Sequence, residues 1–348
     1  MNPYVLSSLI SSLGLGTTLT FASSHWFLAW MGLEINTLAI IPLMAQHHHP
    51  RAVEASTKYF LTQATAAAMI LFAGTTNAWF TGTWNMTDMP DPLANTMVIT
   101  ALALKIGLAP MHLWMPEVLQ GLDLTTGLIL STWQKLAPLS MIIQTAQDTT
   151  PTLLMALGLL STLVGGWGGL NQTQLRKILA YSSIAHMGWM IIIIQYAPHL
   201  ALLALLTYIL MTSAAFLTFK ALAATKINTL ATAWSKGPVL SATTALVLLS
   251  LAGLPPLTGF MPKWLILQEL SKQDLPATAT IMALAALLSL YFYLRLCYSM
   301  ALTISPNLSN STTPWRTRTT QTSLPLALSA TAALTLLPIT PALLTLIT

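Results

Sequence analysis

Long apolar stretches alternate with short polar connections along almost the whole chain. The hydrocarbon core of a bilayer is about 30 Å thick and requires roughly 20 apolar residues per helix. Eleven stretches meet this requirement, so the pattern predicts an all-α polytopic membrane protein. The predicted transmembrane helices are residues 3–22, 26–45, 59–80, 95–119, 126–145, 152–170, 178–196, 199–223, 238–270, 276–300 and 322–347.

Two of these predicted helices, the fourth and the ninth, carry prolines in their interior. Pro110 and Pro116 each remove a backbone donor and clash with the preceding turn, so the fourth helix is expected to break. The ninth repeats the arrangement, because GLAPMHLWMP at 107–116 matches GLPPLTGFMP at 253–262 in its Gly, Leu, Pro, Met and Pro positions. Paired broken helices of this kind are typical of ion pathways in membranes.

The spacing of the two broken helices predicts an internal repeat. They are five spans apart, and an odd separation means that they cross the membrane in opposite directions, as in an inverted repeat. We therefore expect a first five-helix repeat over residues 1–150 and a second, inverted one over 151–302. Residues 303–348 are expected to form a polar loop, up to residue 321, and a C-terminal transmembrane helix.

Basic residues predict the orientation, because lysines and arginines concentrate in loops on one side of a membrane. Successive loops lie on alternate sides of the membrane, and the loops of one side hold a single basic residue, Lys272. The N-terminus is then on the positive side and the C-terminus on the opposite side. The basic residues of the other side are Arg51, Lys58, Arg176, Lys177, Lys220, Lys226, Lys236, Arg295, Arg316 and Arg318.

Composition narrows the chemistry that is expected of the chain. With 55% hydrophobic and 7% charged residues and a mean hydropathy of +0.69, the sequence excludes a soluble or disordered domain. Its formal charge of +5 is too thinly spread for a nucleic-acid site. Cys297 is the only cysteine, which excludes iron–sulfur clusters and cysteine-based zinc sites. The glycine run at 165–169 lies in an apolar helix, so it suits close helix packing and not nucleotide binding. We therefore expect this chain to bind no nucleotide, metal or other cofactor.

Four charged residues are predicted at membrane depth: Glu34, Lys105, Lys135 and Lys263. Each costs about 2.5 to 3.5 kcal/mol near the bilayer centre, and such residues usually mark ion pathways or proton relays. A buried lysine can release and regain a proton, whereas arginine cannot, and no arginine is predicted at this depth.

His112 and His186 are possible further members of this relay. A purely structural role stays open for each candidate. Glu34 would then serve as the partner of a lysine, Lys263 would reach the interface along the unwound segment, and the histidines would be hydrogen-bonded packing residues.

Five runs in the sequence resemble a known family. They are WMGLEINTLAIIPL at 30–43, EASTKYFLTQATAA at 54–67, KIGLAPMHLWMPEV at 105–118, LRKILAYSSIAHMGWM at 175–190 and GLPPLTGFMPKW at 253–264. The chain is similar over essentially its whole length to the subunit 2 family of NADH dehydrogenase, the mitochondrially encoded antiporter-like membrane subunits of respiratory complex I. Antiporter-like subunits generally contain more helices than the eleven expected here, but both five-helix repeats are complete.

The resemblance implies a proton-translocating module of the H⁺-translocating NADH:ubiquinone reductase. Its half-channels would use Glu34 and Lys105, with Lys135 as the central lysine and Lys263 on the exit side. NADH, FMN, iron–sulfur clusters and ubiquinone are expected to bind other subunits, and the partners are the other membrane-arm subunits and the lipid bilayer.

The resemblance also places the chain in the mitochondrial inner membrane, with its N-terminus in the matrix and its C-terminus facing the intermembrane space. Two alternatives remain, a stand-alone cation/proton antiporter and a structural or assembly subunit of the membrane arm.

Overall fold

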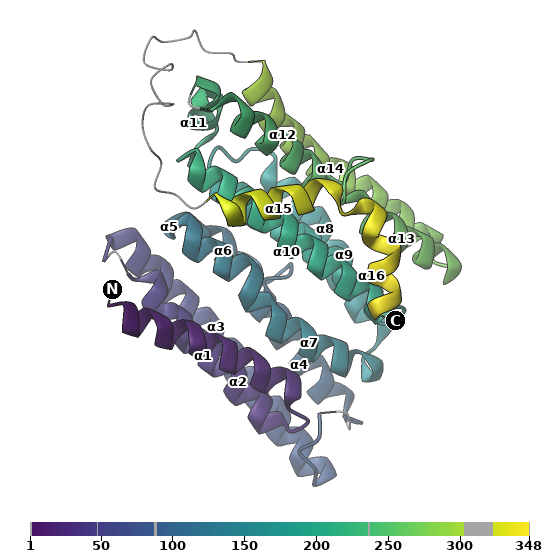
Figure 1. Ribbon diagram of the computed structural model, residues 1–348. Coiled ribbons are helices and arrows are strands. Elements are labelled where there is room, and N and C mark those ends of the chain that lie inside the picture. The colour runs from purple at the N-terminus through teal and green to yellow at the C-terminus, as the bar shows by residue number, and fades with distance from the viewer. Residues whose placement is uncertain (1, 47, 87–88, 236, 303–322, 348) are drawn as a thin grey trace. The chain divides into compact units, whose positions relative to one another are not determined.

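The computed structural model describes residues 2–46, 48–86, 89–235, 237–302 and 323–347, and within these ranges it contains helices and no strands (Figure 1). The predicted all-α class is therefore confirmed. The chain forms two compact units, Met1–Ser161 and Thr162–Thr348, and the boundary between them falls inside one helix, α8. Each unit is described separately below.

The first unit begins with a long antiparallel pair, α1 and α2 (Figure 1). Gly16 and Gly32 allow their backbones to approach closely, because a Cβ at Gly16 would lie 2.8 Å from the carbonyl oxygen of Gly32. The helices of this unit are α1 (Pro3–Ala22), α2 (Trp26–Met44), α3 (Pro50–Thr81), α4 (Pro92–Ile106), α5 (Trp114–Gly121), α6 (Leu124–Thr132), α7 (Leu136–Thr145) and the first part of α8 (Pro151–Gly169), with 3₁₀ turns at Trp133–Lys135 and Ala146–Asp148.

In the second unit, the glycine run of α8 is a packing surface, as the sequence predicts. A Cβ at Gly165 would lie 2.6 Å from the Ala185 nitrogen, and one at Gly166 would lie 2.8 Å from the Leu288 Cβ. The helices of this unit are the rest of α8, α9 (Leu175–Ile193), α10 (Pro198–Ala221), α11 (Ile227–Ala231), α12 (Pro238–Ala252), α13 (Phe260–Lys272), α14 (Pro276–Ala301), α15 (Leu324–Thr335) and α16 (Thr340–Ile347), with 3₁₀ turns at Thr232–Ser235 and Leu337–Ile339.

Both predicted helix breaks are present, and they have the same local backbone. α4 ends at Gly107 with φ of 84°, and α12 ends at Gly253 with φ of 85°. This left-handed conformation favours glycine, which caps a helix C-terminus without steric penalty. The peptide bonds before Pro110 and Pro256 are both cis. The matching sequences thus produce matching breaks, between α4 and α5 and between α12 and α13.

Two segments predicted as uninterrupted helices are interrupted in the structure. The fifth is divided into α6 and α7 by the 3₁₀ turn that contains Lys135. The last is divided into α15 and α16 and bends by 67°, next to Pro338, which cannot donate a backbone hydrogen bond. The polar connection expected at 303–321 lies outside the described residues.

Five helices in the described residues are each long and apolar enough to cross a membrane, and the bent C-terminal pair makes a sixth if it is one span. These five are α1, α2, α8, α10 and α14. α4 and α12, the first halves of the broken helices, are apolar but shorter.

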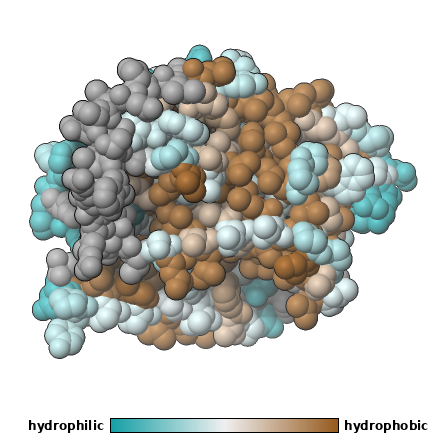
Figure 2. All heavy atoms as spheres, turned by 45° about the horizontal axis from the view of Figure 1, so that its top comes forward, coloured by the Kyte–Doolittle hydropathy of each residue, from teal (hydrophilic) through white to brown (hydrophobic). Residues whose placement is uncertain are grey.

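Apolar side chains cover much of the face seen in Figure 2. Large hydrophobic residues such as Phe72, Trp167 and Leu284 are exposed on single helices, as in proteins that contact lipid.

Candidate functional site

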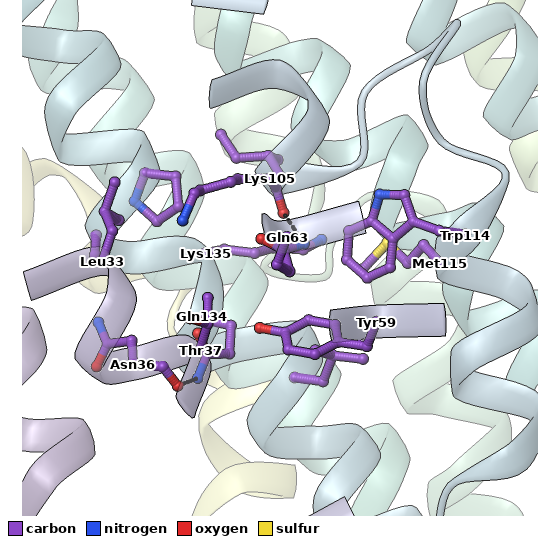
Figure 3. A pocket seen from close by; sticks show the side chains of 14 residues that line it. Leu33, Asn36, Thr37, Tyr59, Gln63, Lys105, Trp114, Met115, Gln134 and Lys135 are labelled. Atoms are coloured by element: carbon purple, nitrogen blue, oxygen red, sulfur yellow. Dashed lines mark hydrogen bonds between the residues drawn. The ribbon is translucent and has the colours of Figure 1, made fainter. Parts of the chain in front are cut away.

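Lys105 and Lys135 line one cavity inside the first unit (Figure 3). The cavity has a volume of about 10 Å³, close to the space that one water molecule needs. Its walls combine apolar side chains with a set of uncharged polar ones. The polar and aromatic lining residues are Asn36 and Thr37 of α2, Tyr59 and Gln63 of α3, Trp114 of α5 and Gln134 beside Lys135.

Lys105 lies in the last turn of α4, directly before the break. Its side chain is 6% exposed, and within the described residues its Nζ has no hydrogen-bond partner. The backbone carbonyls beside it do have hydrogen-bond donors. Gln63 Nε2 donates to the Lys105 carbonyl at 3.4 Å, and Trp114 Nε1 donates to the Leu104 carbonyl at 3.0 Å. Side chains therefore replace the hydrogen bonds that the helix loses at its end.

Glu34 lies on α2 between Leu33 and Asn36, two of the α2 residues that line the cavity, but it is not itself a lining residue. The Thr37 hydroxyl donates a long hydrogen bond, 3.4 Å, to the Glu34 carboxylate. No ion pair joins Glu34 to Lys105 in the part of the chain that the structure describes, although the carboxylate interacts electrostatically with Lys105 and with Tyr59. The structure thus brings Glu34 close to the lysine cavity without an ion pair to Lys105.

Lys135 is buried, with 2% of its side chain exposed, in the 3₁₀ turn between α6 and α7. The neighbouring Gln134 donates from Nε2 to the Asn36 carbonyl at 3.2 Å, which links this turn to α2. Because the turn interrupts the helix, Lys135 and Gln134 project from a segment without the regular α-helical spacing.

Lys263 and His186 share a second cavity, inside the second unit. Its volume is about 20 Å³, and Thr207 and Met211 of α10 also line it. Lys263 Nζ donates to the Ala252 carbonyl at 2.8 Å, so the lysine caps the C-terminus of α12 at the break. The His186 ring lies 5.5 Å from the ring of Tyr208, measured between centroids.

His112 is located in the break between α4 and α5, where it is 8% exposed. Its Nδ1 lies 3.2 Å from the Pro110 carbonyl oxygen. It is not among the residues that line the cavity of Lys105 and Lys135. The structure therefore does not join His112 to the lysines through this cavity.

Several uncharged cavity residues were not predicted from the sequence. Tyr59, Gln63 and Gln134 lie at the lysine cavity, yet the search for charged residues at membrane depth overlooks them. Their signal is present in the sequence, because a glutamine inside an apolar helix needs a hydrogen-bond partner just as a charge needs a counter-ion.

An exposed cluster of charged side chains joins α3 to α5, the helix that follows the first break. The Nζ of Lys58 on α3 lies 2.8 Å from a carboxylate oxygen of Glu54, on the same helix, and 2.8 Å from one of Glu117, on α5. The hydrogen bond with Glu117, and after it the one with Glu54, raises the pKa of Lys58. Glu117 stands where the matching motif of the second unit has Lys263, so the two breaks carry opposite charges at this position.

Comparison with known proteins gives consistent matches along the chain. Residues 23–289 match the family model described as NADH:quinone oxidoreductase/Mrp antiporter, TM, and residues 290–344 match that of the NADH dehydrogenase subunit 2 C-terminus. NADH-ubiquinone oxidoreductase chain 2 of Carassius auratus is 81% identical, and that of Danio rerio is 74% identical, each over the full length of both chains. The chain belongs to the NADH-ubiquinone oxidoreductase chain 2 family.

Solved structures agree with this family assignment. A chain of respiratory complex I from Thermus thermophilus superposes with a TM-score of 0.86 at 26% identity, over 99% of this chain and 80% of that one. A chain of the Mrp complex from Dietzia sp. shares the fold, with a TM-score of 0.83 at 17% identity over 97% of this chain and 76% of that one.

The expected resemblance and the function class that it implied are thus confirmed. The chain is a multi-pass membrane subunit of the NADH:ubiquinone oxidoreductase of respiratory complex I, and its antiporter-like domain supports a role in proton translocation. Within the described residues, no group of three His, Cys, Asp or Glu side chains is placed to hold a metal ion.

Proposed function

We propose that the chain moves protons through a relay of Glu34, Lys105, Lys135 and Lys263, with His186 beside Lys263. The observation that carries this proposal is the cavity shared by Lys105 and Lys135, two buried lysines whose side chains face the same space of about 10 Å³. A water molecule in a space of this size can bridge two polar groups that do not touch.

Glu34 controls the charge of Lys105 in this proposal. When the carboxylate approaches, it stabilises the protonated lysine, and when it withdraws, the low-dielectric surroundings favour proton release. Thr37 and the uncharged lining residues offer alternative hydrogen bonds while the pair is separated. The glycine at the end of α4, next to Lys105, gives the backbone a place to move.

Proton transfer continues in the second unit through Lys263 and His186. Lys263 is held by the Ala252 carbonyl, and the cavity of about 20 Å³ that it shares with His186 has room for a bridging water. Lys135, on the last helix of the first repeat, is assigned the transfer between the two repeats. His112 remains a possible member of the relay, in the first break.

The topology that accompanies this function has eleven spans. Helices one to five and six to ten form two inverted repeats, residues 1–150 and 151–302, and residues 303–348 add a loop and the bent C-terminal span. The matching breaks at Gly107 and Gly253 support the repeat. We assign the membrane to the mitochondrial inner membrane because the relatives are chain 2 of the NADH-ubiquinone oxidoreductase of animals such as Carassius auratus. The N-terminus faces the matrix and the C-terminus the intermembrane space, an orientation that the distribution of basic residues supports.

The electron-transfer reactions take place in other subunits, and only their energy reaches this chain. NADH, FMN, iron–sulfur clusters and ubiquinone bind other subunits of the complex, and the other membrane-arm subunits are the partners of this chain.

The test measures proton pumping and NADH oxidation by the assembled complex in sealed vesicles. Lys105→Met, Lys135→Ala and Lys263→Met should each lower the protons pumped, whereas Lys220→Met, at the exposed end of α10, should not. Full pumping by all three variants would assign the chain a structural role. Ion-dependent proton flux through the chain alone in liposomes would instead favour a self-sufficient antiporter.

A further inference from the structure

The amide of Asn95 is buried near the N-terminal end of α4. Its side chain is 2% exposed, and neither Oδ1 nor Nδ2 has a hydrogen-bond partner among the described residues. Burying an amide without partners costs free energy, and native proteins normally pair such groups with protein or with ordered water. The position of Asn95 therefore calls for a ligand that both donates and accepts hydrogen bonds.

Asn95 lines a cavity of about 20 Å³ inside the first unit, between the start of α4 and the connection that leads into α8. Its other polar walls are Thr96, Thr149 and Thr150. Thr96 and Thr149 each donate their hydroxyl proton to a backbone carbonyl, Leu93 at 2.9 Å and Ala146 at 2.8 Å. The Thr96 hydroxyl oxygen can still accept a hydrogen bond through a lone pair.

These groups match the needs of one water molecule. The volume exceeds the roughly 10 to 15 Å³ that a water needs, and a buried water typically makes two to four hydrogen bonds. Such a water can accept from Asn95 Nδ2 and donate to Asn95 Oδ1 or to a threonine hydroxyl. We propose that the Asn95 amide, together with the Thr96 hydroxyl, holds an ordered water at this end of α4.

The site is separate from the lysine cavity. Asn95 precedes Lys105 by ten residues on the same helix, which corresponds to about 15 Å along the helix axis. Asp91, the N-cap of α4, lies on the same side, and Thr150 is exposed. The water site thus lies between the unit surface and the relay, at the end of α4 opposite the break.

Its role rests on the proposed function. The water accepts a proton on one lone pair and passes on one of its own protons, while the Asn95 amide stays neutral. On that basis we assign the water one step of proton exchange between the Lys105 region and the aqueous side at the Asp91 end of α4.

The first test is a density map of the assembled complex at a resolution that shows water. A peak should lie about 2.7 to 3.2 Å from the Asn95 amide and the Thr96 hydroxyl. A map in which the Asn95 amide bonds directly to protein, with no water in the cavity, would overturn the proposal.

The second test compares variants in vesicles. Asn95→Leu keeps the branched shape and the number of side-chain heavy atoms but removes both polar atoms, so proton pumping should fall several-fold at unchanged complex content. Asn95→Thr, which can still bind the water, should retain more pumping, and the exposed control Asn171→Leu should retain all of it.

The outcomes separate the two proposals. If Lys105→Met abolishes pumping and Asn95→Leu leaves it intact, the water site has no part in the path and the relay stands. If both variants pump fully, the relay itself is wrong. If Asn95→Leu fails to assemble, the map of the unaltered complex and the Asn95→Thr variant decide the question.

Discussion

At the scale of single residues, the depth of a charge in an apolar segment was the informative signal. Lys105 and Lys135 were predicted at membrane depth, and both are buried at one cavity. The sequence could not reveal that they share it, because Lys135 projects from a 3₁₀ turn that helical periodicity does not predict. Nor could it identify Gln63 and Trp114 as partners of the α4 carbonyls, since those contacts depend on packing between elements.

Glu34 and Lys105 should behave as one functional unit. Glu34→Gln and Lys105→Met should each depress proton pumping strongly, and the double variant should be no worse than the poorer single one, because effects within a unit are non-additive. The measurement is protons pumped per NADH in vesicles. Losses that simply add in the double variant would show that the two residues act independently.

Lys135 should be required for coupling but not for folding. Because its side chain faces a cavity with polar walls, Lys135→Ala should slow coupled turnover while the complex still assembles, as judged by native electrophoresis. A structure of the assembled complex in which no water or polar atom lies within reach of Lys135 Nζ would contradict this role.

At the scale of elements, the two proline-containing motifs were sufficient to predict where α4 and α12 end. Gly107 and Gly253 take the same left-handed conformation because the same Gly-Leu-x-Pro sequence follows each helix. The 67° bend of the C-terminal pair was not predicted, although Pro338 was visible. A proline in a membrane helix often produces only a kink. The Thr258 hydroxyl donates to the Ala333 carbonyl in the last turns of α15, and a contact of this kind between distant segments cannot be predicted from the sequence.

Substitution of the two capping glycines should destabilise the breaks. Gly107→Ala and Gly253→Ala place a Cβ on a backbone with positive φ, which costs about 1 kcal/mol or more. At Gly253 the added Cβ would also lie 3.0 Å from Lys263 Nζ. Thermal unfolding of the purified complex should begin at a lower temperature. Gly14→Ala is the control, since a Cβ there meets nothing within 4 Å; equal stability of all three variants would contradict this account of the caps.

At the scale of the whole molecule, composition alone indicated a membrane protein without redox centres of its own. The purified chain should neither bind NADH nor reduce quinone, because it carries no nucleotide-binding fingerprint and only one cysteine. A spectroscopic titration with NADH measures this. Saturable, stoichiometric binding by the isolated chain would contradict the assignment of redox chemistry to other subunits.

The central claim is that Lys105 exchanges protons and does not merely supply a fixed positive charge. Lys105→Arg tests it most directly, because arginine keeps the charge but does not release its proton in proteins. The measurement is proton uptake per NADH oxidised by the assembled complex in sealed vesicles, at matched complex content. We expect the arginine variant to lose pumping as strongly as Lys105→Met. Full pumping by Lys105→Arg would contradict the account and place the proton path elsewhere.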